Sequence, residues 1–213
     1  MTHPIRIGFL IYPDVTQLDA TGPAQILSRV PGAVIHMVWK SVGPVQTDAG
    51  FSINATDDFN TCPDLDVICV PGGLGQRPLM QDTDVLAFLA RQGAQAKYVT
   101  SVCSGSLLLG AAGLLKGYRS ACHWAFRDAL PIFGAEAVAE RVVRDRNRIS
   151  GGGVTAGIDF GLTMAAELAG DDVAKEIQLF VEYNPAPPFS AGSPESAGPE
   201  LEARVRAIFA SAG

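Results

Sequence analysis

The stretch from Ala96 to Leu115 (AKYVTSVCSGSLLLGAAGLL) constrains the fold of this chain more than any other. A β-branched run, Tyr98 to Val102, meets Cys103 and Ser104, and an apolar, helix-like run follows. This order predicts a strand, a tight turn and a helix, with Cys103 held above the sheet edge. The free N–H groups and partial positive charge of a helix N-terminus both favour a thiolate. We therefore predict that Cys103 is a nucleophile; the alternative is a small, buried structural cysteine.

Strands and helices alternate along the rest of the chain. Strands are predicted at 5–11, 34–40, 66–70 and 119–122, a hairpin at 44–55, and two short strands at 142–148. Helices are predicted at about 21–30, 78–94, 123–130, 155–169, 171–183 and 199–210. The pattern predicts an α/β fold: a mostly parallel sheet sandwiched by helices, flavodoxin-like, with a cysteine nucleophile elbow. We expect one domain over residues 1–213, with an extended arm and a short terminal helix at about 184–213.

Charge and cysteine usage restrict the classes of function. The formal net charge of −6 gives no basic footprint for nucleic acid or for an anionic membrane. The first residues are typical of a strand and not of a signal peptide, and no run is long enough to span a membrane. Four cysteines without zinc-site spacing are typical of a reduced protein, so we expect a cytoplasmic location.

Two other loops are predicted to meet Cys103. Asp19 precedes the helix expected to start at Thr21, and it follows the first strand. Gly72 and Gly73 follow the strand at 66–70, where their N–H groups could point at a ligand. The carboxyl ends of parallel strands share one edge of a sheet, which brings these residues together. Taken singly, Asp19 could be a solvated loop carboxylate or a cap, and the glycines an ordinary turn.

The chain offers few partners for a catalytic thiol. A cysteine hydrolase usually pairs its thiol with histidine, but His3 is terminal and His36 lies mid-strand, which leaves His123. We favour Asp19, because a carboxyl in a partly dry pocket has a raised pKa and suits proton transfer near neutral pH. His123 could instead be a packed helix start. Thr155, at a glycine-rich helix start, either lines the pocket or serves helix packing.

Several motifs together resemble the PfpI-like superfamily, which has the class I glutamine amidotransferase-like fold, and within it most closely the isocyanide hydratases. They are IGFLIYPDVTQLDATGP, LDVICVPGG, YVTSVCSGSLLLGAAGLL, HWAF, ERVVRD, GGGVTAGIDF and EYNPAPPFSAGSPE, and they cover essentially the whole chain. One departure is Ser104, where the family pattern has threonine. The hydroxyl survives, but the methyl group that would restrict its rotamer is lost.

The resemblance implies hydration of an isocyanide, R–N≡C, to an N-substituted formamide without metal or organic cofactor. It implies Cys103 as the nucleophile that forms a thioimidate and Asp19 as acid and base, and we predict that Ser104 orients this pair. Substrate-binding roles are expected for Gly72, Gly73, His123 and Thr155. The expected partners are a small-molecule isocyanide and a second copy of the chain in a homodimer.

Two alternatives remain open from the sequence. The first is another cysteine reaction on the same fold, such as a peptidase, glutaminase or glyoxalase-type enzyme, for which His123 would be the partner of Cys103. The second is a non-catalytic sensor in which Cys103 responds to oxidation. Related domains precede DNA-binding helices in regulators, but this chain shows no basic helix-turn-helix.

Overall fold

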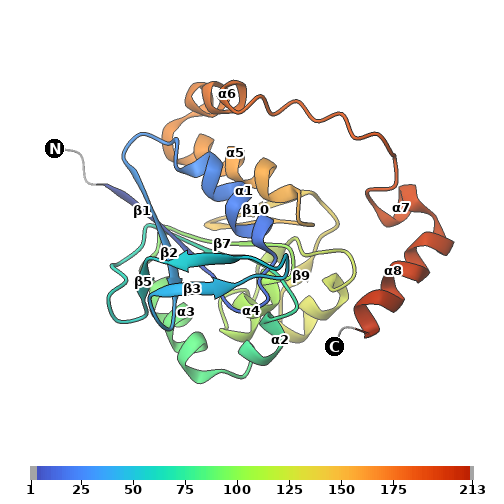
Figure 1. Cartoon of the computed structure of the whole chain (residues 1–213), viewed down its shortest axis with the longest axis horizontal. Coiled ribbons are helices and arrows are strands. Elements are labelled where there is room, and N and C mark those ends of the chain that lie inside the picture. The colour runs from blue at the N-terminus through green and yellow to red at the C-terminus, as the bar shows by residue number, and fades with distance from the viewer. Residues whose placement is uncertain (1–3, 212–213) are drawn as a thin grey trace.

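The computed structural model describes residues 4–211, so His3 and the outermost ends of the predicted domain lie outside the described residues. A seven-stranded sheet forms its centre, in the order β10-β11-β7-β6-β1-β2-β5 (Figure 1). Its neighbours pair in parallel except β10 and β11. The strands are β1 Ile5–Leu10, β2 Ala33–Trp39, β5 Asp57–Asp58, β6 Val67–Val70, β7 Tyr98–Val102, β10 Val142–Asp145 and β11 Arg148–Gly151. This confirms the predicted α/β class.

Helices cover both faces of this sheet. They are α1 Gln17–Leu27, α2 Gln76–Leu79, α3 Thr83–Gln95, α4 Gly105–Ala111, α5 Ala156–Ala169, α6 Asp171–Phe180, α7 Pro194–Ala197 and α8 Pro199–Ser211, with a 3-10 helix at Arg127–Phe133. Two small strand pairs lie outside the central sheet. β3 Gly43–Gln46 pairs with β4 Ser52–Ala55 in antiparallel, and β8 Arg119–Ser120 pairs with β9 Glu136–Ala137 in parallel. One apolar core lies under α3 and α4, and the other lies under α1 and α5.

The register of the central strands brings three loops to one edge. Phe9 of β1 pairs with Cys69 of β6, and Val70 pairs with Ser101 of β7. The three strands therefore end within about one residue of one another, and their following loops carry the predicted site residues. Almost every residue of these strand ends is buried, as a parallel sheet covered on both faces requires.

Four predicted helices differ from the structure in their boundaries. The first helix starts at Gln17 and not at Thr21, so Asp19 lies in its first turn instead of in the preceding loop. The helix predicted at 78–94 is two helices, because the Asp82 carboxylate accepts hydrogen bonds from the N–H groups of Asp84 and Val85 and caps a new start.

The helix predicted from His123 begins later, at Arg127, and is a 3-10 helix that contains Pro131. A proline inside a helix lacks the N–H donor and clashes with the preceding turn. The helix predicted to reach Tyr183 ends at Phe180, and Glu182 beyond it has a positive φ of 52°. The predicted hairpins at 44–55 and 142–148 are confirmed.

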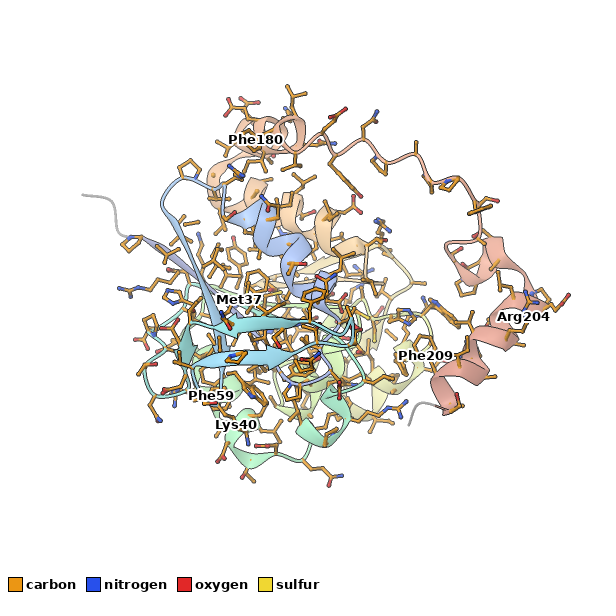
Figure 2. The ribbon with its side chains drawn as sticks, viewed as in Figure 1. Met37, Lys40, Phe59, Phe180, Arg204 and Phe209 are labelled. Atoms are coloured by element: carbon orange, nitrogen blue, oxygen red, sulfur yellow. The ribbon has the colours of Figure 1, made fainter. Side chains whose placement is uncertain are left out.

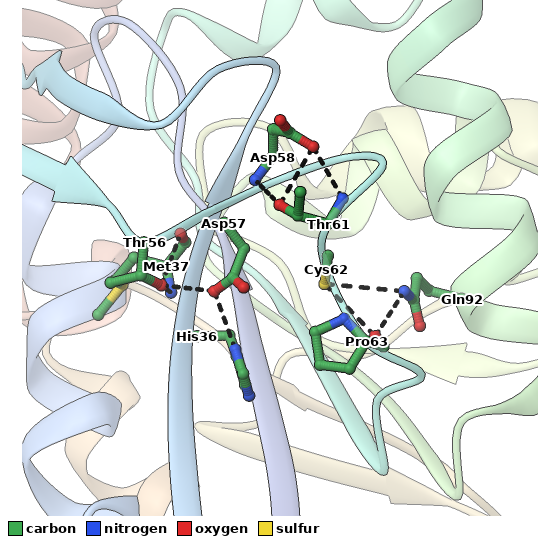
Figure 3. A network of polar contacts seen from close by, with 9 residues as sticks. All are labelled: His36, Met37, Thr56, Asp57, Asp58, Thr61, Cys62, Pro63 and Gln92. Carbon is green, nitrogen blue, oxygen red and sulfur yellow. Dashed lines mark hydrogen bonds and ion pairs between the residues drawn. The ribbon is translucent and has the colours of Figure 1, made fainter.

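His36 lies in β2, as predicted, and also contributes to a polar network at the outer edge of the sheet (Figure 3). Its Nδ1 is 2.9 Å from the Asp57 carboxylate, which also accepts a hydrogen bond from Thr56. Asp58 accepts bonds from the N–H groups of Asn60 and Thr61 and so stabilises the following turn. This network holds the short strand β5 against β2, away from Cys103.

The C-terminal arm leaves α6 and crosses the outside of the molecule to α7 and α8 (Figure 1). Residues 184–193 contain no helix or strand, and no residue of α8 is fully buried. The predicted terminal helix at 199–210 is therefore confirmed, and it contacts the remainder of the chain through few side chains.

Candidate active site

Cys103 lies at a strained turn between β7 and α4. Its φ is 59°, in the left-handed region that a non-glycine residue seldom adopts. Such a backbone costs on the order of 1–3 kcal/mol and persists where neighbours enforce it. Here the Cys103 N–H donates to the Gly151 carbonyl at 3.0 Å, and the Ser106 hydroxyl donates to the Cys103 carbonyl at 3.2 Å. The predicted nucleophile elbow is thus present, and the side chain lies in a cavity with the residue only 5% exposed.

Asp19 is completely buried beside this thiol. Its Oδ2 accepts a hydrogen bond of 2.8 Å from the Gly72 N–H. Its Oδ1 has no hydrogen-bond partner among the described residues, and Asp19 and Cys103 lie close enough for each to shift the pKa of the other. The structure therefore brings Cys103 and Asp19 together, with one carboxylate oxygen held by the backbone and the other available to exchange a proton.

The backbone N–H groups of Gly72 and Gly73 hold the side chains of Asp19 and Ser104. The Gly72 N–H is used by Asp19, and the Gly73 N–H donates to the Ser104 hydroxyl at 3.2 Å. A Cβ on Gly72 would lie 2.7 Å from both the nitrogen and the Oγ of Ser104. Gly73 has φ +132°, and a Cβ there would lie 2.6 Å from Thr16 N. The N–H donors that were expected to face a substrate atom therefore bind the side chains of Asp19 and Ser104, although Gly73 still lines the cavity.

Burial controls the protonation of the pair. Loss of solvation raises the pKa of Asp19 from 3.8 to about 7, against the opposing effect of the Gly72 N–H. Burial, and then the Asp19 charge, raise the pKa of the Cys103 thiol well above its usual value, although the Ser104 N–H opposes this shift. Burial of the Cys103 thiol therefore opposes the preference for thiolate that the helix N-terminus provides.

A cavity of about 560 Å³ opens onto Cys103. One wall is polar and is formed by Asp14, Thr16 and Asp48, where the Thr16 hydroxyl donates to Asp48 at 2.7 Å. The other wall is formed by largely apolar side chains, namely Leu74, Pro78, Phe126, Val154 and Phe209, with the ring of His123. Among the described residues that line it, no lysine or arginine offsets the two carboxylates.

His123 lines this cavity without pairing with the nucleophile. Its Nδ1 accepts the Ala125 N–H at 3.2 Å, and burial lowers its pKa, so the ring is neutral. Its ring packs 5.3 Å from that of Phe209 and 5.7 Å from that of Phe126. No hydrogen bond in the described structure joins it to Cys103. The arrangement does not provide the base of a cysteine–histidine enzyme.

Thr155 lies apart from the other predicted residues. It precedes α5 and lines a neighbouring hollow, where the Arg141 guanidinium donates to its carbonyl oxygen at 3.1 Å. It does not line the cavity that contains Cys103. Thr155 is exposed and its side chain makes no capping hydrogen bond to α5, so the structure supports neither the pocket-lining nor the capping interpretation of this residue.

Sequence reasoning missed Tyr12 and the aromatic wall. Tyr12 is fully buried, and its hydroxyl donates to the Pro71 carbonyl at 2.7 Å, which holds the loop that carries Gly72. A tyrosine at the end of a buried strand is a weak signal, because such rings are common in cores. Phe209 lies far along the chain from Cys103, and no local pattern connects the two.

Two further absences hold for residues 4–211. No group of three histidine, cysteine, aspartate or glutamate side chains is placed to bind a metal ion. No helix there has the length and apolar character needed to cross a membrane.

The parallel sheet, the cysteine elbow and the buried carboxyl define a class of protein. A family model described as the DJ-1/PfpI family matches residues 5–167, and the chain belongs to this family. Residues 168–213, which include the arm and α8, lie beyond that match.

Individual proteins of known name are similar to this chain over most of its length. An isonitrile hydratase from Pseudomonas putida is 55% identical over 205 residues, covering 95% of this chain and 90% of the relative. The crystal structure of a ThiJ/PfpI family protein from Pseudomonas syringae superposes with a TM-score of 0.95 at 50% identity, covering 99% and 88% of the two chains. A helix-turn-helix transcriptional regulator from Pseudomonas aeruginosa is 28% identical, and its match covers 84% of this chain but 51% of the regulator.

Proposed function

We propose that this chain is an isocyanide (isonitrile) hydratase that converts R–N≡C and water into the formamide R–NH–CHO. The observation that carries the proposal is Cys103, which lines the cavity, beside the fully buried Asp19, with no histidine hydrogen-bonded to the thiol among the described residues. The high identity to an isonitrile hydratase over nearly the whole chain supports the same activity. The enzyme is a lyase that needs no cofactor in this scheme.

The first step forms a covalent thioimidate. The Asp19 carboxylate takes the thiol proton, and the Cys103 sulfur attacks the terminal carbon of the isocyanide. Asp19 then delivers the proton to that carbon, which gives R–N=CH–S–Cys103. The raised pKa of Asp19, about 7, suits both halves of this transfer, because the carboxyl gains and loses a proton near neutral pH.

The second step adds water and releases the product. The water oxygen bonds to the thioimidate carbon, while Asp19 takes a proton from the water and passes it to nitrogen. The resulting R–NH–CH(OH)–S–Cys103 loses its hydroxyl proton to Asp19 as the C–S bond breaks. The formamide leaves, and the proton returns to the pair. Ser104, whose Oγ is held by the Gly73 N–H, orients the two reacting side chains.

Formamide production from phenyl isocyanide tests this function. Wild-type enzyme should turn the substrate over, Cys103→Ser should lose turnover, and Asp19→Asn should lose at least about a hundredfold, the usual scale of one positioned acid–base group. Near-normal turnover by Asp19→Asn would sink the assigned role of Asp19. His123→Ala is the control: a cysteine–histidine enzyme would be crippled, whereas this mechanism predicts a much smaller loss.

We also propose a cytoplasmic homodimer that acts on a small molecule without nucleic acid, with residues 1–213 folding as one domain. The free, buried cysteines support a reducing location. Leu179 and Phe180 on α6, 81% and 66% exposed, are candidates for the covered face of a dimer. A sedimentation experiment that finds a monomer at micromolar concentration would remove the dimer, and fractionation of cells tests the location.

A further inference from the structure

The C-terminal helix α8 places one aromatic side chain in the cavity that contains Cys103. Phe209 is half-buried, whereas its neighbour Ile208 is 63% exposed. Figure 2 labels Phe209 on the side of α8 that faces the rest of the molecule, with Arg204 on the outer side. Both Phe209 and Cys103 line the same cavity. An otherwise exposed helix therefore contributes a side chain to the site.

Phe209 completes an aromatic cluster with three residues of the 123–126 segment. Its ring centroid lies 5.1 Å from that of Phe126, 5.3 Å from His123 and 6.4 Å from Trp124, each in an edge-to-face arrangement. Aromatic rings favour edge-to-face and offset-stacked contacts, so a further planar aromatic group is a suitable partner for these rings. Three members of the cluster, His123, Phe126 and Phe209, line the cavity that contains Cys103.

Specific contacts hold α8 at this place. The Arg77 guanidinium donates to the Phe209 carbonyl at 3.4 Å, and the Arg206 guanidinium lies 4.8 Å from the centre of the Trp124 ring. The half-buried residues Leu201, Val205 and Phe209 recur at helical spacing and form the inner face of the helix. The helix is thus oriented, although none of its residues is fully buried.

We propose that Phe209 is a specificity-determining residue that binds the substituent R of the isocyanide and makes the enzyme prefer planar, aromatic substituents. The reacting carbon must reach the Cys103 sulfur, so the substituent extends into the rest of the cavity, where the apolar wall is formed by Phe126 and Phe209. This inference rests on the proposed hydratase function. It concerns the residue that selects among isocyanides and not the chemistry at Cys103.

Steady-state kinetics with phenyl isocyanide and methyl isocyanide test the proposal. In Phe209→Ala, the KM for phenyl isocyanide should rise about tenfold, the scale of one lost aromatic contact. The KM for methyl isocyanide and both kcat values should stay within about twofold to threefold, because the small substrate does not reach Phe209. Phe209→Leu should fall between wild type and Phe209→Ala. The matched control is Phe189→Ala, which removes an 81% exposed phenylalanine of the arm and should leave both substrates unchanged.

An equal change for both substrates would overturn the proposal, because it would show that Phe209 acts through folding or closure of the site. No change for either substrate would overturn it as well. A second readout does not need turnover: alkylation of Cys103 by 2-bromoacetophenone and by iodoacetamide, followed by peptide mass spectrometry. Phe209→Ala should slow the aromatic reagent several-fold relative to iodoacetamide. If wild type hydrates no isocyanide, the proposed function fails, and this ratio alone decides the role of Phe209.

Discussion

Replacing Asp19 by asparagine should stabilise the protein at neutral pH while it abolishes activity. Asparagine has the shape of the carboxyl group, and its carbonyl oxygen can still accept the Gly72 N–H. It carries no charge, so it avoids the desolvation that raises the pKa of Asp19 to about 7. A shift from 3.8 to about 7 corresponds to about 4 kcal/mol of unfolding free energy at pH values above 7.

The sign follows from proton binding. Between about pH 4 and pH 7 the folded protein keeps a proton on Asp19 that the unfolded chain has released. The contribution of Asp19 to the free energy of unfolding therefore falls as the pH rises from about 4 to about 7. Below and above this range the contribution does not change with pH. Asp19→Asn has no such proton, so the advantage of the variant over wild type should grow from pH 4 to pH 8 by up to about 4 kcal/mol.

Urea unfolding of both proteins at a series of pH values measures this difference. With an m-value of about 2–3 kcal/mol/M, the midpoint of the variant should exceed that of wild type by about 1–2 M more at pH 8 than at pH 4. The other groups that titrate between pH 4 and pH 8 are shared by the two proteins, and the Cys103 thiol, whose pKa depends on Asp19, titrates above this range. A difference that stays flat across this range would refute the reasoning, since it would mean that the pKa of Asp19 is the same in the folded and unfolded protein.

Four other outcomes are expected. The kcat/KM of wild type should rise about tenfold per pH unit below pH 7 and level above it, because the Asp19 carboxylate must accept the thiol proton; a pH–rate profile without this limb would contradict that role. Gly72→Ala should lower activity by at least about tenfold, because its Cβ would collide with Ser104, and activity equal to wild type would contradict the close approach. Tyr12→Phe leaves the buried Pro71 carbonyl without its partner and should cost about 1–3 kcal/mol in thermal or urea unfolding, whereas a cost near zero would show that the bond is dispensable. 4-Isocyanobenzoate should have a kcat/KM several-fold below that of phenyl isocyanide at low salt, because Asp14 and Asp48 repel its carboxylate, and equal values would count against that repulsion.

Local sequence patterns were sufficient for much of the fold. The run of β-branched residues before Cys103 and the apolar helix after it produced a correct strand, turn and helix, because both periodicities are local. The predicted start of α1 is too late because Pro23 is expected in the first turn of a helix, whereas α1 contains it in its second turn. The prediction of a single helix at 78–94 does not include Asp82 as an N-cap, whereas in the structure Asp82 caps the start of a second helix.

The sequence also predicted part of the candidate site. Cys103, Asp19 and the two glycines were expected at one edge, since parallel strands bring their carboxyl ends together, and the structure places them there. The uses of the glycine N–H groups were not predictable, because a hydrogen-bond partner depends on side-chain positions from other loops. Thr155 shares the edge but faces another hollow, a distinction that spacing along the chain does not contain.

The sequence by itself determined which residues could react and which edge of the sheet would bring them together, because the alternation of strands and helices is a local pattern and the carboxyl ends of parallel strands share one edge. The tertiary structure decided how those residues are charged and what surrounds them. Burial by both helical layers raises the pKa values of Asp19 and Cys103, and this desolvation exceeds the local effect of the helix N-terminus. The contribution of Phe209 likewise depends on where an extended arm places a distant helix, and only the folded chain specifies that position.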